Sequence, residues 1–222
     1  MTPANIAGMA SLNGLNIIAV TDHNTARNAP GILAACDGYG IVAIPGMEIT
    51  TAEDIHIVAL FPDVLSISAF EEQLEPYRIH YQNPVDIYGH QYVMDENDNV
   101  LCEEPYLLSN ALMLPLEDAV ALVKNAGGVV YPAHIDREAN GIVAILGTVP
   151  EDLHFSVVEF HDPANIPQYV EKHGLEGKRI VVSSDAHFLW DIQDAQHYFE
   201  LDETLSPDDI RRKVLEILEG GL

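Results

Sequence analysis

Short apolar runs recur along the chain, and each is followed by polar or charged residues. The runs that predict strands cover residues 16–21, 41–44, 54–61, 129–133, 156–160 and 179–184. Helical patterns separate or flank them, at residues 3–13, 29–37, 70–77, 115–125, 167–173 and from 207 onward. Apolar strands that alternate with helices are typical of an α/β fold with a parallel sheet or barrel.

The first and last helices carry clear boundary signals. Thr2 is the predicted N-cap of the first helix, Pro3 fits its first position, and Gly14 ends it. The last helix opens at Ser206 and Pro207 with two acidic residues behind them. These signals predict helices at both ends of the chain.

Residues 80–110 break this rhythm. The segments QYVM and VLCE flank the turn-rich sequence DENDN, which predicts a β-hairpin. We therefore expect one domain over residues 1–222, with residues 80–110 as an insert or lid.

Charge is the extreme property of the composition. Thirty-five acidic residues against ten Lys and Arg give a formal net charge of −25, while 48% of the residues are hydrophobic. Such a chain should repel nucleic acids and anionic membranes, so neither is expected as a stable partner. An anionic substrate would need local cations from Arg, Lys or bound metal. Two cysteines and no visible export signal indicate a cytoplasmic location.

Candidate metal ligands fall at the carboxyl ends of successive predicted strands, where parallel α/β folds place their active sites. His56 is the exception, since it lies inside a predicted strand. A single His at a strand end is more often a satisfied polar residue, but several together need mutual neutralisation or a cation. Glu159 and His161 could equally well support the ligands from behind or lie at the surface. For the remaining histidines we expect a structural role rather than metal binding. The predicted ligands are His23, Glu48, His56, His134, Asp185 and His187.

The predicted ligand set is nitrogen and oxygen without thiolate, which suits Zn²⁺, Mn²⁺ or Fe²⁺. Several carboxylates and imidazoles together favour more than one metal, with a bridging carboxylate. Paired metals activate a water molecule and hold phosphate oxygens, so the pattern predicts hydrolysis of a small phosphorylated substrate. The chain shows no Walker A loop, GxGxxG or GxSxG motif.

Five motifs together resemble the PHP (polymerase and histidinol phosphatase) family: TDHNT, PGMEIT, DIHIVALF, PAHIDR and SSDAH. The resemblance covers nearly the whole chain and is nearest to stand-alone bacterial metal-dependent phosphoesterases. It implies a distorted (β/α)7 barrel with up to three divalent metals and a small phosphomonoester or nucleotide-type substrate.

The resemblance also implies roles for individual residues. His23 and His187 would share one metal, Glu48 would bridge two, and His56 and His134 would complete one side. Asp185 would bind the metal on the other side, and Asp22 would orient its neighbours. Arg137 would either meet substrate phosphate or form a surface salt bridge. The catalytic set implied is Glu48, Asp185 and Arg137.

One departure from the family pattern concerns the first strand. The family opens with a strand bearing HxH, and this sequence starts at Met1, beyond that position. Either the start lies upstream, or the protein is a catalytically depleted relic with a regulatory metal- or ligand-binding role. Unpaired strand edges would then favour a homo-oligomer or a gap covered by the chain's own termini. A third reading, amide hydrolysis, would need a bridging Lys, and none stands beside these strands.

Overall fold

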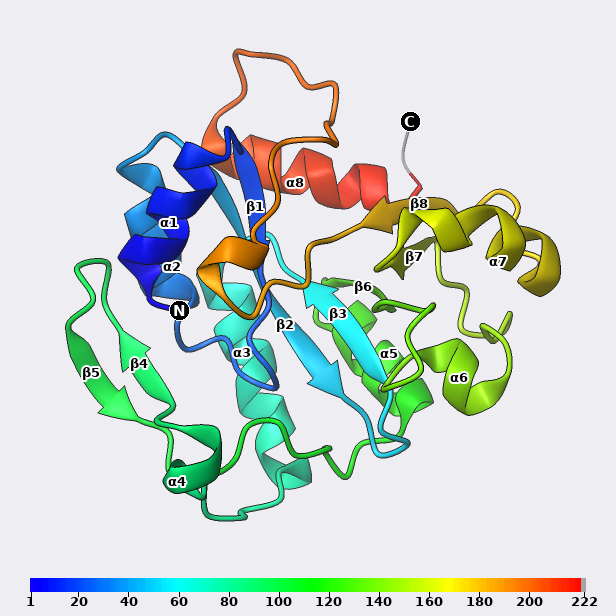
Figure 1. Cartoon of the computed structure of the whole chain (residues 1–222), viewed down its shortest axis with the longest axis horizontal. Coiled ribbons are helices and arrows are strands. Elements are labelled where there is room, and N and C mark those ends of the chain that lie inside the picture. The colour runs from blue at the N-terminus through cyan, green and yellow to red at the C-terminus, as the bar shows by residue number, and fades with distance from the viewer. Residues whose placement is uncertain (221–222) are drawn as a thin grey trace.

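The computed structural model describes residues 1–220, which form a mixed α/β fold (Figure 1). A four-stranded sheet lies at its centre in the order β1–β2–β3–β6. Its strands are β1 (Ile17–Val20), β2 (Val42–Thr50), β3 (His56–Leu60) and β6 (Val129–Pro132). Two further strands, β7 (Val157–Phe160) and β8 (Arg179–Val182), pair in parallel beside β6.

Helices surround this central sheet. In chain order they are α1 (Pro3–Leu12), α2 (Ala29–Asp37), α3 (Val64–Leu74), α4 (Val85–Tyr88), α5 (Leu116–Asn125), α6 (Ile142–Leu146), α7 (Ile166–His173) and α8 (Pro207–Leu218). Helices α2, α3 and α8 pack on β2, α5 packs on β6, and α1 lies on α2. None of the helices within residues 1–220 is both long enough and apolar enough to cross a membrane.

Strand β3 corrects the prediction of a parallel sheet. It runs antiparallel to both β2 and β6, whereas β1 and β2 are parallel. The reason is that β2 continues to Thr50 and only residues 51–55 separate it from β3. A connection this short cannot hold a crossover helix, so the chain must turn back as a hairpin. Within residues 1–220 no ladder joins β6 to β7 or β8 to β1, so the sheets do not close into a barrel.

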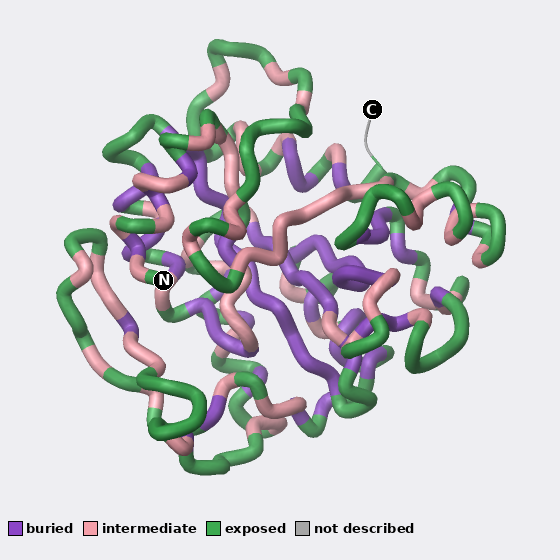
Figure 2. Tube along the Cα trace, in the orientation of Figure 1, coloured by how far each residue is buried: buried purple, intermediate pink, exposed green. Residues whose placement is uncertain are grey.

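The central strands are buried on both faces (Figure 2). Met47 and Ile57 belong to the large core beneath α3 and α5. The opposite face carries Ile44 and Leu60, which pack with α8. Because side chains alternate along a strand, Glu48 points to the same face as Ile44. Helix α8 therefore fills one end of this inner face and leaves the other end to polar residues.

The predicted hairpin within residues 80–110 is confirmed. Strands β4 (Tyr92–Met94) and β5 (Val100–Glu103) are antiparallel and joined through the DENDN turn. Thr2 is the N-cap residue of α1 as predicted, but its side chain accepts no capping hydrogen bond. Asp98 of this turn accepts the Ala4 backbone N–H at 2.8 Å instead, and Thr2 donates its hydroxyl hydrogen to the same carboxylate.

Helix α3 begins at Val64, six residues before the predicted start at residue 70. The signal is Asp63, whose carboxylate accepts a hydrogen bond from the Ser66 backbone N–H at 2.8 Å. An aspartate at this position satisfies one of the free N–H groups of the first turn. The helix therefore starts where its cap stands.

Candidate metal centre

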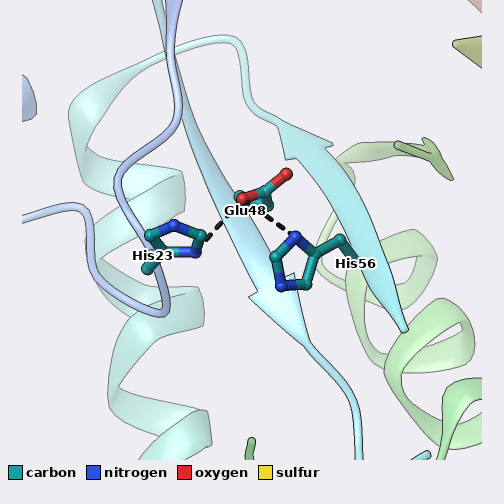
Figure 3. A group of neighbouring side chains, drawn as sticks. All are labelled: His23, Glu48 and His56. Carbon is teal, nitrogen blue, oxygen red and sulfur yellow. Dashed lines mark ion pairs between the residues drawn. The ribbon is translucent and has the colours of Figure 1, made fainter. Parts of the chain in front are cut away.

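Three imidazole rings surround the carboxylate of Glu48. Glu48 Oε2 lies 3.1 Å from His23 Nδ1 and 3.3 Å from His56 Nδ1, and Glu48 Oε1 lies 3.4 Å from His134 Nε2. Figure 3 shows His23 and His56 approaching Glu48 from opposite sides. Glu48 and His134 are buried, with 6% and 2% of their surface exposed. We call these four residues the Glu48 cluster.

The β2–β3 hairpin explains how His56 reaches Glu48. Thr50 stands directly opposite His56 in the register, so Glu48 is its diagonal neighbour on the same face. Because β3 runs antiparallel, its first residue lies at the edge where β2 and β6 end. The prediction that Glu48 follows its strand is corrected, since Glu48 lies inside β2.

His23 is placed by a short backbone bridge to β2. The Asn24 N–H donates to the Glu48 carbonyl at 2.8 Å, and the Glu48 N–H donates to the Asp22 carbonyl at 3.1 Å. The buried Asn24 side chain accepts the Thr50 N–H and donates to the carbonyls of Leu108 and Asn110. Asn24, in the TDHNT motif, thus joins the His23 loop to strand β2 and to the C-terminal end of the segment 80–110.

His134 and Asp185 adopt left-handed backbone conformations, with φ of 25° and 47°. Residues other than glycine rarely occupy this region unless the surrounding structure holds them there. For His134 the Glu159 carboxylate does so, since it accepts the His134 N–H at 3.1 Å and the Ser183 hydroxyl at 2.7 Å. Gly141 lets the following loop close on itself, because a Cβ there would lie 2.3 Å from the Arg137 carbonyl.

The charges of the Glu48 cluster are strongly coupled. Burial would raise the pKa of Glu48, but contacts with His134 and His56 and the charges of His56 and His23 hold it well below its usual range. Burial would lower the pKa of His134, yet the Glu48 carboxylate raises it overall. Burial lowers the pKa of His23. Glu48 is therefore an anion that attracts cations.

The Glu48 cluster fits a divalent metal. His23, Glu48 and His56 can each offer a ligand atom, with all three atoms within 4.8 Å of one another. His56 Nδ1 and His134 Nε2 face each other at 3.2 Å. Two ligands of a tetrahedral zinc ion stand about 3.3 Å apart, so these spacings match those around a single ion. The buried Nδ1 of His23, 3.1 Å from Glu48 Oε2, also makes no hydrogen bond among the described residues, which is costly without compensation.

Asp185 and His187 lie next to the Glu48 cluster rather than inside it. The ring centroids of His187 and His23 are 5.7 Å apart. His187 Nδ1 donates to the Asp185 carbonyl at 2.9 Å, so the Nε2 atom of this tautomer keeps its lone pair for a ligand. The Asp185 carboxylate is paired with the Arg137 guanidinium. Arg137 thus forms a salt bridge, as one of its two predicted roles holds, and its partner is a predicted site residue.

Other candidates take supporting or peripheral positions. Glu159 is buried against His134, so its surface alternative is wrong, and His161 is exposed. Asp22 is hydrogen bonded to Asn28 at 3.2 Å, and burial raises its pKa. The sequence did not predict the role of Ser183, whose hydroxyl donates a hydrogen bond to Glu159. Its position in the SSDAH motif, two residues before Asp185, could have indicated it.

A separate cleft of ≈ 820 Å³ lies between α3 and the segment 80–110, and it reaches Asn24 beside His23. Its two arginines are neutralised locally, because Arg27 pairs with Glu104 and Arg78 with Glu71. The cleft therefore offers space next to the site but no uncompensated positive charge from these arginines.

Comparison with known proteins gives partial matches. No protein-family model matches the chain. An uncharacterised protein of Methanocaldococcus jannaschii, MJ1587, is 33% identical over 92 residues, which is 40% of this chain and 52% of that protein. The lesion-specific endonuclease PfuEndoQ from Pyrococcus furiosus superposes with a TM-score of 0.63 and 15% identity, over 99% of this chain and 51% of the endonuclease. The chain thus spans about half the length of both proteins.

Two further solved structures match over most of both chains. One is assigned as a metal-dependent phosphoesterase, from Bifidobacterium adolescentis, with a TM-score of 0.56 and 17% identity over 100% of this chain and 91% of that one. The other is an amidohydrolase from Chromobacterium violaceum, with a TM-score of 0.54 and 19% identity over 96% and 91%. At these identities the likeness establishes a shared fold.

Proposed function

We propose that the protein is a metal-dependent phosphoesterase that hydrolyses a small phosphomonoester or nucleotide-type substrate. The observation that carries the proposal is the Glu48 cluster, in which one buried carboxylate faces three imidazole nitrogens at 3.1–3.4 Å. A fold shared with a protein assigned as a metal-dependent phosphoesterase and with an endonuclease supports it. The PHP-like motifs and their order support kinship with the stand-alone PHP proteins and a distorted barrel completed by an HxH strand.

In this proposal His23, Glu48, His56 and His134 hold a divalent cation. The nitrogen-rich donor set favours Zn²⁺, Mn²⁺ or Fe²⁺, and the two oxygens of Glu48 suit a bridge in a larger centre. Such a cation, when bound, acidifies water and stabilises the charge that builds on phosphoryl oxygens.

The chain's own residues supply position and charge. Arg137 offers a planar guanidinium that matches phosphate oxygens in two-point contacts. Glu159 holds the His134 backbone, and the Asp185 carbonyl fixes the tautomer of His187. The formal charge of −25 opposes stable binding of nucleic acid, so the proposed substrate is small. We propose the insert at residues 80–110, within a single domain 1–222, as a lid beside the site.

In the alternative proposal the protein binds a metal or ligand in a regulatory role and does not catalyse a reaction. Homo-oligomerisation and a cytoplasmic location belong to the proposal as well. Amide hydrolysis is disfavoured because three of the four lysines are engaged elsewhere, Lys213 with Glu216 at 3.1 Å. Lys124 donates to the Leu153 carbonyl at 2.9 Å and Lys178 to the Phe155 carbonyl at 2.7 Å.

The test is a substrate panel with metal-reconstituted protein. It contains p-nitrophenyl phosphate, glycerol phosphate, nucleoside monophosphates, bis(p-nitrophenyl) phosphate, a short oligonucleotide and an anilide. We expect turnover of monoesters that needs Mn²⁺, Zn²⁺ or Fe²⁺ and is abolished in Glu48→Gln. Turnover of the anilide alone, or of the oligonucleotide alone, would overturn the proposed substrate. Metal binding without any turnover would favour the regulatory alternative.

A further inference from the structure

His161 follows β7 directly, and its backbone is fixed while its ring is free. The His161 N–H donates to Asp136 Oδ1 at 2.8 Å, and the Asp162 N–H donates to Oδ2 of the same carboxylate at 2.9 Å. Asp136 also accepts a hydrogen bond from the Asn165 side chain at 2.9 Å. The His161 imidazole, in contrast, is exposed and forms no hydrogen bond or ion pair with another residue of the described range 1–220.

The alternation of side chains along β7 gives the direction of this ring. Val157 packs on the inner face with α8, whereas Phe160 belongs to the large core on the outer face. Glu159 points to the inner face, where its carboxylate accepts the His134 N–H. His161 comes two residues after Glu159, so its Cα–Cβ bond points to the same side.

The end of β7 lies between the two loops that carry other candidate site residues. The Ile135 N–H donates to the Glu159 carbonyl at 2.8 Å, which joins the chain after His134 to β7. On the other side, β8 runs parallel to β7 and leads to Asp185. An extended chain advances about 3.3 Å per residue, so the Cα of His161 stands about 7 Å beyond that of Glu159.

Hydrolysis of a phosphomonoester needs a proton donor besides the attacking water, because an alkoxide is a poor leaving group without a proton. The guanidinium of Arg137 cannot serve, since it stays charged at all relevant pH values. An imidazole can both hold and release a proton near neutral pH. Among the histidines at this edge of the sheet, His161 is the one whose ring is not drawn into the Glu48 cluster or onto the Asp185 carbonyl.

We propose that His161 is the general acid that protonates the leaving oxygen of the ester. This role rests on the proposed function and adds a catalytic residue from β7, a strand that supplies none of the predicted metal ligands. A water oxygen bonds to phosphorus and gives one proton to solvent. The bond from phosphorus to the ester oxygen breaks, its electron pair stays on that oxygen, and the oxygen takes the proton of the His161 imidazolium. The neutral imidazole then regains a proton from solvent, so the products are the alcohol and phosphate.

The experiment compares two leaving groups with Mn²⁺-loaded wild type, His161→Asn and His154→Asn. His154 is the matched control, since it is also exposed but stands before β7, at the opposite end of the strand. Circular dichroism melting checks that each variant is folded. His161→Asn should lower kcat/KM for glycerol phosphate by about 10²- to 10⁴-fold, the usual contribution of a general acid. It should change p-nitrophenyl phosphate far less, because p-nitrophenolate leaves without a proton, and His154→Asn should change neither.

Each other outcome has a definite meaning. Equal losses for both substrates in His161→Asn, or no loss for either, would overturn the proton-donor role. Hydrolysis of p-nitrophenyl phosphate alone by wild type would overturn it too, and would leave a phosphoesterase that depends on a good leaving group. No turnover of any phosphate ester by wild type would refute the proposed function itself.

The second arm tests contact without turnover. Long-range ¹H–¹⁵N NMR spectra report the imidazole nitrogens of Zn²⁺-loaded protein, and loss of signals in His161→Asn assigns that ring. Inorganic phosphate should shift the His161 signals, since its fourth oxygen stands where the ester has its leaving oxygen, and should leave the His154 signals in place. Unshifted His161 signals at saturating phosphate would overturn the contact.

Discussion

Ionisation of Glu159 should lower the free energy of unfolding of the metal-free protein as pH rises. Glu159→Gln should abolish this pH dependence. Burial raises the pKa of Glu159 to about 7, although hydrogen bonds from Ser183 and His134 oppose the rise. The Gln amide can still accept the His134 N–H and donate to the Ser183 hydroxyl. The substitution therefore keeps both contacts and deletes only the ionisation.

The magnitude follows from the two pKa values. Below pH 4.5 the carboxyl group is protonated in both the folded and the unfolded chain. Between pH 4.5 and about 7 the unfolded chain ionises while the folded protein keeps its proton, so the free energy of unfolding falls across this window. At 1.36 kcal/mol for each pKa unit, the loss is about 3 kcal/mol by pH 8.

The assay is urea denaturation of wild type and Glu159→Gln at pH 5 and pH 8, with EDTA present because a bound cation would stabilise the ionised form. We expect the stability of the variant relative to wild type to rise by about 3 kcal/mol from pH 5 to pH 8. Glu176→Gln, an exposed position, serves as the control and should show no such change. An equal difference at both pH values would refute the claim that a buried, protonated Glu159 supports His134.

Two further predictions concern the elements that hold the site. Gly46→Ala should reduce stability by about 1–3 kcal/mol, because its Cβ would lie 2.6 Å from Leu60 Cδ2 between β2 and β3. Gly8→Ala has room at 3.6 Å and should not destabilise; similar thermal melts for both variants would contradict the packing argument. Asp98→Ala should reduce the free energy of unfolding by about 1 kcal/mol, since it removes the cap of α1, and urea denaturation measures this. Glu96→Ala in the same exposed turn is its control, and equal losses in the two variants would argue against a cap.

Much of the fold could be predicted because its strands are short apolar runs with clear ends. Helix α2 begins and ends where its pattern does, at Ala29 and Asp37. The direction of β3 could not be predicted in the same way, since an apolar strand reads alike in either direction. Only the short connection after Thr50 indicates a hairpin. Its length could not be read from the sequence, because Pro45 and Gly46 indicated that the strand ends early, whereas β2 continues through them to Thr50.

In the candidate site, too, local motifs predict some features while others depend on tertiary contacts. The positions of His23, Glu48, His56 and His134 follow from motifs at one edge of the sheet. The contact between Arg137 and Asp185 joins residues 48 positions apart, and no local pattern encodes it. The cap that Asp98 gives to α1 spans 94 positions and was missed for the same reason. Long-range polar contacts depend on tertiary structure, whereas periodicity reports only local structure.

The central claim is that Glu48 organises a metal site, and the most direct measurement is the Mn²⁺ dissociation constant of wild type, Glu48→Gln and Asp22→Asn by isothermal titration calorimetry. Asp22 is the matched control, because its backbone carbonyl accepts the Glu48 N–H while its carboxylate is hydrogen bonded to Asn28 rather than to an imidazole. Residues that only support ligands change metal affinity by about 10- to 100-fold. We predict that Asp22→Asn stays within that range and that Glu48→Gln exceeds it, because Glu48 is the anion at the centre of three imidazoles. Equal affinities in the two variants would contradict the account.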